Sequence, residues 1–163
     1  MWICKRYKPA RALDVGGGKG LLAYLLNKNG WKVDVVDPNV TDQLTKYKDL
    51  ETGKRVLVDG ENFKRIVSPF KEEMVKDYDL VIGLHAHGSN LQIINACKKY
   101  HKDFLLLPCC VIGEPIVKKP GINWLDSLVE YAKSQGFKVK KDSLNFKGQN
   151  VIIYTDKKSK KCK

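Results

Sequence analysis

Three glycines at alternate positions, Gly16, Gly18 and Gly20, stand between the acid Asp14 and an apolar, helix-like run that begins at Leu21. Glycine lets the backbone pass close to a ligand in conformations that a Cβ forbids. A strand that leads into a glycine turn and then into a helix N-terminus is typical of nucleotide sites. This stretch is therefore the first place where the sequence predicts binding chemistry.

A second acid decides which nucleotides fit. Asp37 ends an apolar run, where a carboxylate can accept hydrogen bonds from two ribose hydroxyls. The dinucleotide spacing G-x-G-x-x-G/A is met in its alanine form by Gly18, Gly20 and Ala23, so spacing alone leaves a nicotinamide dinucleotide open. Asp14 decides more, because a carboxylate beside the loop repels a pyrophosphate and tolerates a cationic ligand.

A second group of reactive residues follows two later strands. His85 and His87 come after one apolar run, and Cys109 and Cys110 come after the next. Because those strands should be neighbours, the four side chains are expected to converge. In one interpretation His85 is a general base, since an imidazole can exchange a proton near neutral pH. In a second, Cys109 is a nucleophile toward a pyrimidine ring.

Two further interpretations of this group stay open. The four side chains suit zinc chemically, but adjacent cysteines chelate poorly and the usual C-x₂₋₄-C spacing is absent. Alternatively, the cysteines are small buried apolar residues, and the histidines have a structural role and form hydrogen bonds. We assign catalytic roles to His85 and Cys109 and assign no metal ligand.

Strands and helices alternate along the chain, by hydrophobic period and by glycine and proline punctuation. Strands are predicted at about 12–15, 32–37, 64–67, 79–84 and 103–107, with a terminal hairpin formed by 137–141 and 150–155. Helices are predicted at about 20–29, 41–50, 90–100 and 122–135, with a helical turn or two at 72–76 and a short strand or hairpin arm at 55–60. This order predicts an α/β fold whose mostly parallel sheet has helices on both faces and an antiparallel edge.

Composition bounds the class of protein. The net charge is +12, which suggests a polyanionic partner with RNA as the first possibility. No apolar run is long enough to span a membrane, and five cysteines, an odd number, do not form a disulfide framework. We expect a cytoplasmic protein with one domain over residues 1–156 and a disordered basic tail at 157–163.

The glycine loop and its two acids resemble the S-adenosylmethionine site of class I methyltransferases, in the pattern Asp14-x-Gly16-x-Gly18-x-Gly20 followed by Asp37. The resemblance covers about the full chain and implies a Rossmann-like, seven-stranded sheet. It implies that Gly16 and Gly18 pack under the methionine and ribose portions of the cofactor. It also implies that Asp14 faces the cofactor's amino end and that Asp37 holds the ribose hydroxyls.

Four more residues are expected to contact the cofactor by the same resemblance. Gly17 and Pro38 flank the residues above, and His85 is counted with them. The family often has an acid after its third strand that meets the adenine amine, and Phe70 stands near that place here. Phe70 either packs on the adenine or belongs to the core.

The reactive end is similar to a methyltransferase group with Gly-Leu-His-x-Cys-Gly after the fourth strand and Pro-Cys-Cys after the fifth. This chain has His87 where that group has cysteine. The resemblance implies an S-adenosylmethionine-dependent methyltransferase, and the charge favours an RNA or ribonucleoprotein acceptor. Alternatives are a non-catalytic cofactor-binding subunit, a small-molecule methyltransferase and, less well matched, a nicotinamide-dependent reductase. Because inserts are short, a partner subunit or a homodimer is expected to help recognise the substrate.

Overall fold

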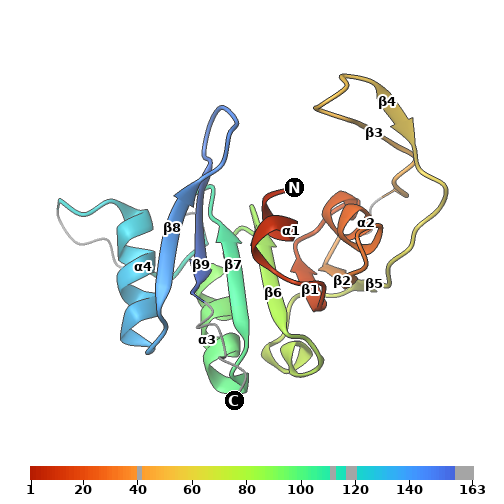
Figure 1. Ribbon diagram of the computed structural model, residues 1–163. Coiled ribbons are helices and arrows are strands. Elements are labelled where there is room, and N and C mark those ends of the chain that lie inside the picture. The colour runs from red at the N-terminus through yellow and green to blue at the C-terminus, as the bar shows by residue number, and fades with distance from the viewer. Residues whose placement is uncertain (40–41, 111–112, 117–120, 157–163) are drawn as a thin grey trace, which may run out of the picture.

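A seven-stranded sheet runs through the centre of the protein in a computed structural model, which describes residues 1–39, 42–110, 113–116 and 121–156 (Figure 1). The strand order is β5-β2-β1-β6-β7-β9-β8, and β9 is antiparallel to both of its neighbours while the pairs from β5 to β7 are parallel. The strands are β1 Arg11–Val15, β2 Lys32–Asp37, β5 Arg65–Val67, β6 Leu80–Leu84, β7 Asp103–Leu107, β8 Val139–Ser143 and β9 Val151–Thr155. The predicted mostly parallel sheet with an antiparallel terminal pair is confirmed.

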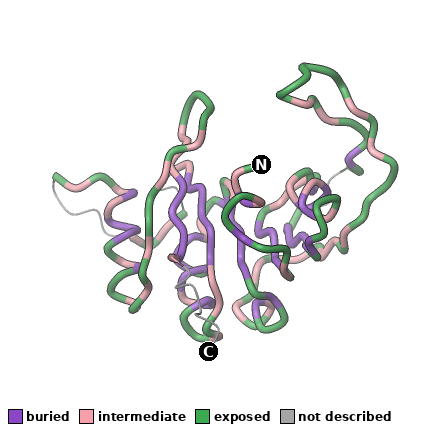
Figure 2. Tube along the Cα trace, viewed as in Figure 1, coloured by how far each residue is buried: buried purple, intermediate pink, exposed green. Residues whose placement is uncertain are grey.

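Helices cover both faces of this sheet, and the alternating side chains of each strand reach two separate cores. Leu13 of β1 packs with Ile93 and Leu128 in one core, while Ala12 packs with Leu26 in the other. The buried strands form the centre of the chain trace in Figure 2. The helices are α1 Trp2–Arg6, α2 Leu21–Asn27, α3 Asn90–Tyr100 and α4 Trp124–Ser134, with a 3₁₀ helix η1 at Glu72–Asp77. No helix among the described residues is long and apolar enough to cross a membrane.

The helix predicted at 41–50 is wrong over its described part. Residues 46–48 form β3 (Lys46–Lys48), which pairs antiparallel with β4 (Arg55–Leu57) in a hairpin that stands away from the main sheet (Figure 1). The Asp49 carboxylate accepts the backbone N–H groups of Glu51 and Thr52, and Gly53 has a φ of +70°. An aspartate that bonds its own turn competes with helix formation. Residue 41 and the predicted tail at 157–163 lie outside the described residues.

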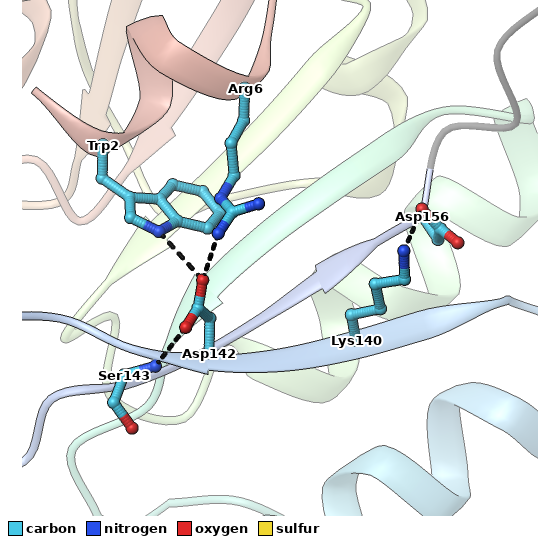
Figure 3. Close-up of polar contacts among 6 residues, drawn as sticks. All are labelled: Trp2, Arg6, Lys140, Asp142, Ser143 and Asp156. Atoms are coloured by element: carbon cyan, nitrogen blue, oxygen red, sulfur yellow. Dashed lines mark hydrogen bonds and ion pairs between the residues drawn. The ribbon is translucent and has the colours of Figure 1, made fainter.

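The helix α1 was not predicted, and a carboxylate distant in sequence holds it. Asp142 on β8 accepts a hydrogen bond from the Trp2 indole N–H at 3.2 Å and pairs with the Arg6 guanidinium (Figure 3). The Ser143 N–H and the Trp2 N–H hold the pKa of Asp142 below its ordinary value. The Trp2 ring also meets Tyr154 edge-on, at 5.0 Å between centroids. The contacts dock the N-terminal helix on the terminal strand pair.

Replacing Asp142 with alanine is expected to lower the melting temperature by about 2–4 °C, because α1 loses a shared acceptor for two side chains. The measurement is thermal unfolding followed by circular dichroism. Asp156→Ala is the matched control, since it removes only the exposed Lys140–Asp156 ion pair of 3.0 Å (Figure 3). Equal melting temperatures for Asp142→Ala and the unaltered chain would show that α1 does not depend on this carboxylate.

Candidate functional site

The glycine loop has the backbone that its sequence predicts. Gly16, Gly18 and Gly20 all have positive φ, at 68°, 52° and 79°, and this left-handed region is one that side chains with a Cβ rarely occupy. The Gly16 N–H donates to the Val36 carbonyl at 2.8 Å, which joins the loop to the neighbouring strand. Gly20 then caps α2. The loop thus lies at the carboxyl ends of β1 and β2, where α/β sheets bind ligands.

Asp37 ends β2 beside this loop and is 8% exposed. One carboxylate oxygen accepts the Gly18 N–H at 3.0 Å, and the other accepts the Asn39 N–H at 2.9 Å. Each oxygen keeps a further lone pair, since a carboxylate has about four acceptor positions. Asp37 therefore orders the loop and can still accept hydrogen bonds from the hydroxyl groups of a ligand.

Asp14 is the most unusual acid of the site. It is 2% exposed, and its Oδ2 has no hydrogen-bond partner within the described part of the chain. Burial, followed by the negative charge of Asp37, raises the pKa of Asp14 to about 7. Gly17 leaves room for this carboxylate, because a Cβ at Gly17 would lie 2.6 Å from Oδ2 and 2.9 Å from Val35 Cγ1. A buried acid without a partner is suited to a cationic ligand.

A cavity of about 320 Å³ opens beside these residues. It is lined by Asp14, Gly16, Gly17, Leu21, Leu22, Leu25 and Leu84. A buried acid whose Oδ2 lacks a partner among the described residues, glycine backbone and leucine side chains suit a ligand with a cationic end, so this cavity fits the methionine end of S-adenosylmethionine. A larger cleft of about 830 Å³ includes Arg11 and Lys32, the first residues of β1 and β2. It therefore reaches the opposite edge of the sheet from the glycine loop.

Arg65 is a residue of this site that sequence reasoning missed. Its guanidinium donates to the Gly18 carbonyl at 2.6 Å and to the Lys19 carbonyl at 3.3 Å, and pairs with Glu61 at 2.6 Å. Phe63 lies over the same loop, because a Cβ at Gly20 would come within 2.1 Å of its ring. The one feature of the sequence that could have indicated this role is an arginine at the first position of the strand beside β2. Arg65 holds the loop carbonyls in place.

Replacing Arg65 with alanine is expected to weaken binding of S-adenosylhomocysteine about tenfold, because two loop carbonyls lose a charged donor. Isothermal titration calorimetry measures the change. Arg65→Lys keeps the charge but not the planar fork, so its affinity should fall between the two. An alanine variant that binds as tightly as the unaltered chain would contradict this positioning role.

Pro38 and Phe70 have different surroundings. Pro38 is exposed directly after β2. Phe70 is half-buried and packs against the core that contains Ile93. Contact of either residue with a cofactor stays a prediction, and the packing of Phe70 favours its interpretation as a core residue.

His85 lies at the turn directly after β6. Its backbone has a φ of 56°, one of two non-glycine residues with positive φ among those described, and its N–H donates to the Leu107 carbonyl at 3.0 Å. The residue is exposed at the carboxyl edge of the sheet. A strained, exposed histidine at this edge suits a functional role better than a structural one.

The other three reactive residues converge as the sequence predicts. His87 Nδ1 lies 3.0 Å from Cys110 Sγ, and His87 Nε2 lies 3.4 Å from Cys109 Sγ. His85 is not part of this close group among the described residues. Burial, and then the hydrogen bond with Cys110, raise the pKa of the Cys109 thiol. The raised pKa disfavours Cys109 as a thiolate nucleophile, and its catalytic role stays a prediction.

Two known proteins that are similar in sequence to this chain have the same name. The chain is 31% identical over 153 residues to "Probable tRNA (uracil-O(2)-)-methyltransferase" of Caenorhabditis elegans, covering 84% of this chain and 26% of that protein. It is 34% identical over 106 residues to the protein of the same name in Caenorhabditis briggsae, covering 63% of this chain and 18% of that protein. The chain thus spans about a quarter or less of the length of these relatives. No protein-family model matches it.

The fold has well-matched solved structures. One is precorrin-6y C5,15-methyltransferase from Geobacter metallireducens, with a TM-score of 0.58, 13% identity, and coverage of 93% of this chain and 81% of that one. At this identity the likeness concerns the fold alone. The chain therefore has the Rossmann-like methyltransferase fold that its glycine loop and terminal hairpin predicted.

Proposed function

We propose that this chain is the methyl-transfer domain of an S-adenosylmethionine-dependent enzyme that methylates an oxygen of a uridine in tRNA. The observation that carries the cofactor is the buried Asp14, whose Oδ2 has no hydrogen-bond partner among the described residues, beside a glycine loop that is bonded to Asp37. The acceptor comes from the name of the two relatives, whose similarity extends over 84% and 63% of this chain. The known relatives are much longer, so the activity and substrate of the whole protein belong to this proposal.

The residues of the loop would hold the cofactor by charge and by close backbone approach. Asp14 would face its ammonium group, and Asp37 would accept hydrogen bonds from its ribose hydroxyls. Gly16, Gly17 and Gly18 would let it lie against the main chain. When bound, S-adenosylmethionine supplies an electrophilic methyl group and keeps the electron pair of the broken C–S bond on sulfur.

His85 would act as the general base for the methyl acceptor. Transfer of a methyl cation to a neutral uridine must be balanced by the loss of one proton from the nucleoside, and a neutral imidazole at the carboxyl edge can accept that proton. The position of His85 after β6 places it on the edge that also carries the glycine loop. The protein's remaining contribution is orientation of the two reactants.

Basic residues provide a surface for RNA. The β3–β4 hairpin carries Lys46, Lys48, Lys54 and Arg55, all exposed, and it projects beyond the sheet (Figure 1). Together with the net charge of +12, this arrangement favours contacts with phosphates. The four lysine and arginine side chains would position tRNA rather than read its sequence.

The alternatives and finer predictions stay proposals. They are a non-catalytic subunit that needs a partner, a small-molecule methyltransferase and a nicotinamide-dependent reductase. Kinship with the group that carries Gly-Leu-His-x-Cys-Gly and Pro-Cys-Cys, a homodimer and a cytoplasmic location also stay predictions. The four cysteines among the described residues are all free thiols.

The test supplies the purified chain with radiolabelled S-adenosylmethionine and, in separate reactions, unmodified tRNA or a small-molecule extract. The tRNA is then digested to nucleosides, and both products are separated by chromatography. Label on a uridine derivative supports the proposal. Label only in a small-molecule extract, or binding of S-adenosylhomocysteine with no transfer to either substrate, contradicts the tRNA activity of this chain. Calorimetry that detects NAD(H) binding and no S-adenosylhomocysteine binding contradicts the cofactor.

A pair of histidine variants tests the proposed base. His85→Ala is expected to lower the transfer rate about 100-fold, a modest effect for a general base. His101→Ala is the matched control, because His101 also has positive φ, at 54°, but it caps the C-terminus of α3. Equal rates for the two variants would remove His85 from the mechanism.

A further inference from the structure

We infer that His87, Cys109 and Cys110 form a binding site for a thiophilic divalent cation, with Zn²⁺ as its natural occupant. The donor atoms of these residues all lie within 4.8 Å of one another, the one group of this kind among the described residues. The inference does not depend on the proposed methyl transfer. It assigns a ligand to residues that the glycine loop and its acids do not use.

The topology brings the three residues together. Strands β6 and β7 are parallel neighbours with Leu84 opposite Leu107, so the segments that follow them leave the same edge of the sheet. The His85 N–H donates to the Leu107 carbonyl and fixes the start of the first segment. His87 follows two residues later on that segment, and the cysteine pair follows β7.

The distances match tetrahedral coordination. Bond lengths of about 2.3 Å to sulfur and 2.0–2.1 Å to nitrogen imply edges of about 3.8 Å between two sulfurs and about 3.6 Å between nitrogen and sulfur. The two sulfurs, of Cys109 and Cys110, are 3.8 Å apart. His87 Nδ1 lies 3.0 Å from Cys110 Sγ and 3.7 Å from Cys109 Sγ, values on either side of the expected edge.

The positions of the two sulfurs allow these adjacent cysteines to bind one ion together. Successive side chains of an extended strand point to opposite faces, but Cys109 and Cys110 lie beyond the end of β7, and their sulfurs face the same imidazole. A cation between them would be held by two segments of the chain. The sequence spacing alone could not show this arrangement, because it depends on the path of the chain after β7.

Contacts farther along the two segments hold the cluster in place. Gly88 and Gly113 meet backbone to backbone, because a Cβ on Gly88 would lie 3.2 Å from the Gly113 carbonyl oxygen. The Glu114 carboxylate accepts the Asn90 backbone N–H at 2.8 Å and the Leu91 N–H at 3.2 Å, at the start of α3. The two segments are thus joined beyond the cluster, and a cation would meet preorganised donors.

The chemistry of the donors selects the ion. Thiolates and imidazole prefer Zn²⁺ over Mg²⁺ or Ca²⁺, which take oxygen ligands. Three protein ligands leave the fourth position to a water or another oxygen donor, as in zinc sites that are not purely structural. His87 is exposed and both cysteines are half-buried, so an ion can enter from solvent.

The experiment titrates the reduced, metal-free full chain with Co²⁺ and then displaces it with Zn²⁺. We expect about one ion per chain, a thiolate-to-cobalt charge-transfer band, and the strong visible bands of tetrahedral cobalt. The changes Cys109→Ser, Cys110→Ser and His87→Ala should each weaken binding at least about tenfold. Cys4→Ser is the matched control, since Cys4 is another half-buried free thiol, and it should bind as the unaltered chain does.

Two results of the cobalt titration would overturn the inference. The first is the absence of a thiolate–cobalt band in the folded, reduced chain. The second is binding that survives both Cys109→Ser and Cys110→Ser. Thermal unfolding provides a second measurement, which can be made on the unaltered chain without the ligand variants. Zn²⁺ should raise the melting temperature of the unaltered chain and of Cys4→Ser. A Zn²⁺-induced rise of equal size in Cys110→Ser also contradicts the site.

Discussion

Replacing Asp37 with alanine is expected to weaken binding of S-adenosylhomocysteine about 300-fold, because two charge-assisted hydrogen bonds to ribose are lost at about 1.5–3 kcal/mol each. Loss of the Gly18 N–H acceptor adds to the effect, since the loop is then free to move. Isothermal titration calorimetry at fixed pH measures the affinity directly. The change is large because the carboxylate combines ligand binding with support of the loop.

Two further variants separate these roles of Asp37. Asp37→Asn keeps the side chain's size and one oxygen acceptor, so its affinity should lie between that of the alanine variant and that of the unaltered chain. Asp79→Ala is the matched control, because the Asp79 carboxylate also accepts a backbone N–H, that of Arg11 at 3.1 Å, but at the amino end of β1. The assignment of Asp37 to the ribose is wrong if Asp37→Ala and Asp79→Ala bind equally well.

The parts of the fold that were predictable from sequence depend on local patterns. The bounds of β2, α3 and β7 agree with the predictions at 32–37, 90–100 and 103–107, because each is a periodic or continuous apolar run that a proline or a helix end delimits. The glycine loop was predictable for the same reason. Its positive φ values follow from residue type, and the strand before it and the helix after it are its neighbours in sequence.

Contacts between distant residues account for what the sequence did not reveal. The helix α1 depends on Asp142, 140 residues from Trp2. Arg65 reaches the Gly18 carbonyl across 47 residues, and no local pattern marks an arginine for that role. The first arm of the β3–β4 hairpin, at 46–48, was predicted to be part of a helix, because the turn that follows it depends on one aspartate side chain. Such contacts follow from packing, which periodicity does not describe.

The reactive edge lies between these two cases. Neighbouring parallel strands made it predictable that His87 and the cysteines would meet. The sequence could not separate His85 from that group, because the separation depends on a backbone turn with positive φ at His85. Residue types and topology therefore predicted the edge of the sheet at which the reactive side chains lie. The side-chain distances then separated the exposed His85 from the cluster of three residues.

The affinity for S-adenosylhomocysteine is expected to rise about tenfold per pH unit as the pH increases toward 7 and then to level off. In the free protein the pKa of Asp14 is raised to about 7, first by burial and then by the charge of Asp37. The ligand's ammonium favours the carboxylate, so binding below pH 7 must release a proton from Asp14. Calorimetry in buffers with different ionisation enthalpies measures that proton directly.

The same shift fixes how the stability of the free protein depends on pH. An aspartate in the unfolded chain ionises near pH 4, whereas folded Asp14 holds its proton up to about pH 7. Between these values the folded state binds more protons, so the contribution of Asp14 to the free energy of unfolding is fully present below about pH 4 and is lost as the pH rises to about 7. Asp14→Asn should remove this slope, as measured by urea unfolding across the interval.

Asp14→Asn should also remove the proton release and weaken S-adenosylhomocysteine binding at pH 8 by several hundredfold, about 3–4 kcal/mol, because a buried ammonium then lacks its counter-charge. Asp37→Ala provides an internal check on the cause. Without the neighbouring negative charge the pKa of Asp14 falls, so the weaker binding that remains should reach its plateau at a lower pH. If the unaltered chain and Asp14→Asn release the same number of protons, the ammonium does not meet this acid. The ribose contact with Asp37 would then have to account for the binding of S-adenosylhomocysteine.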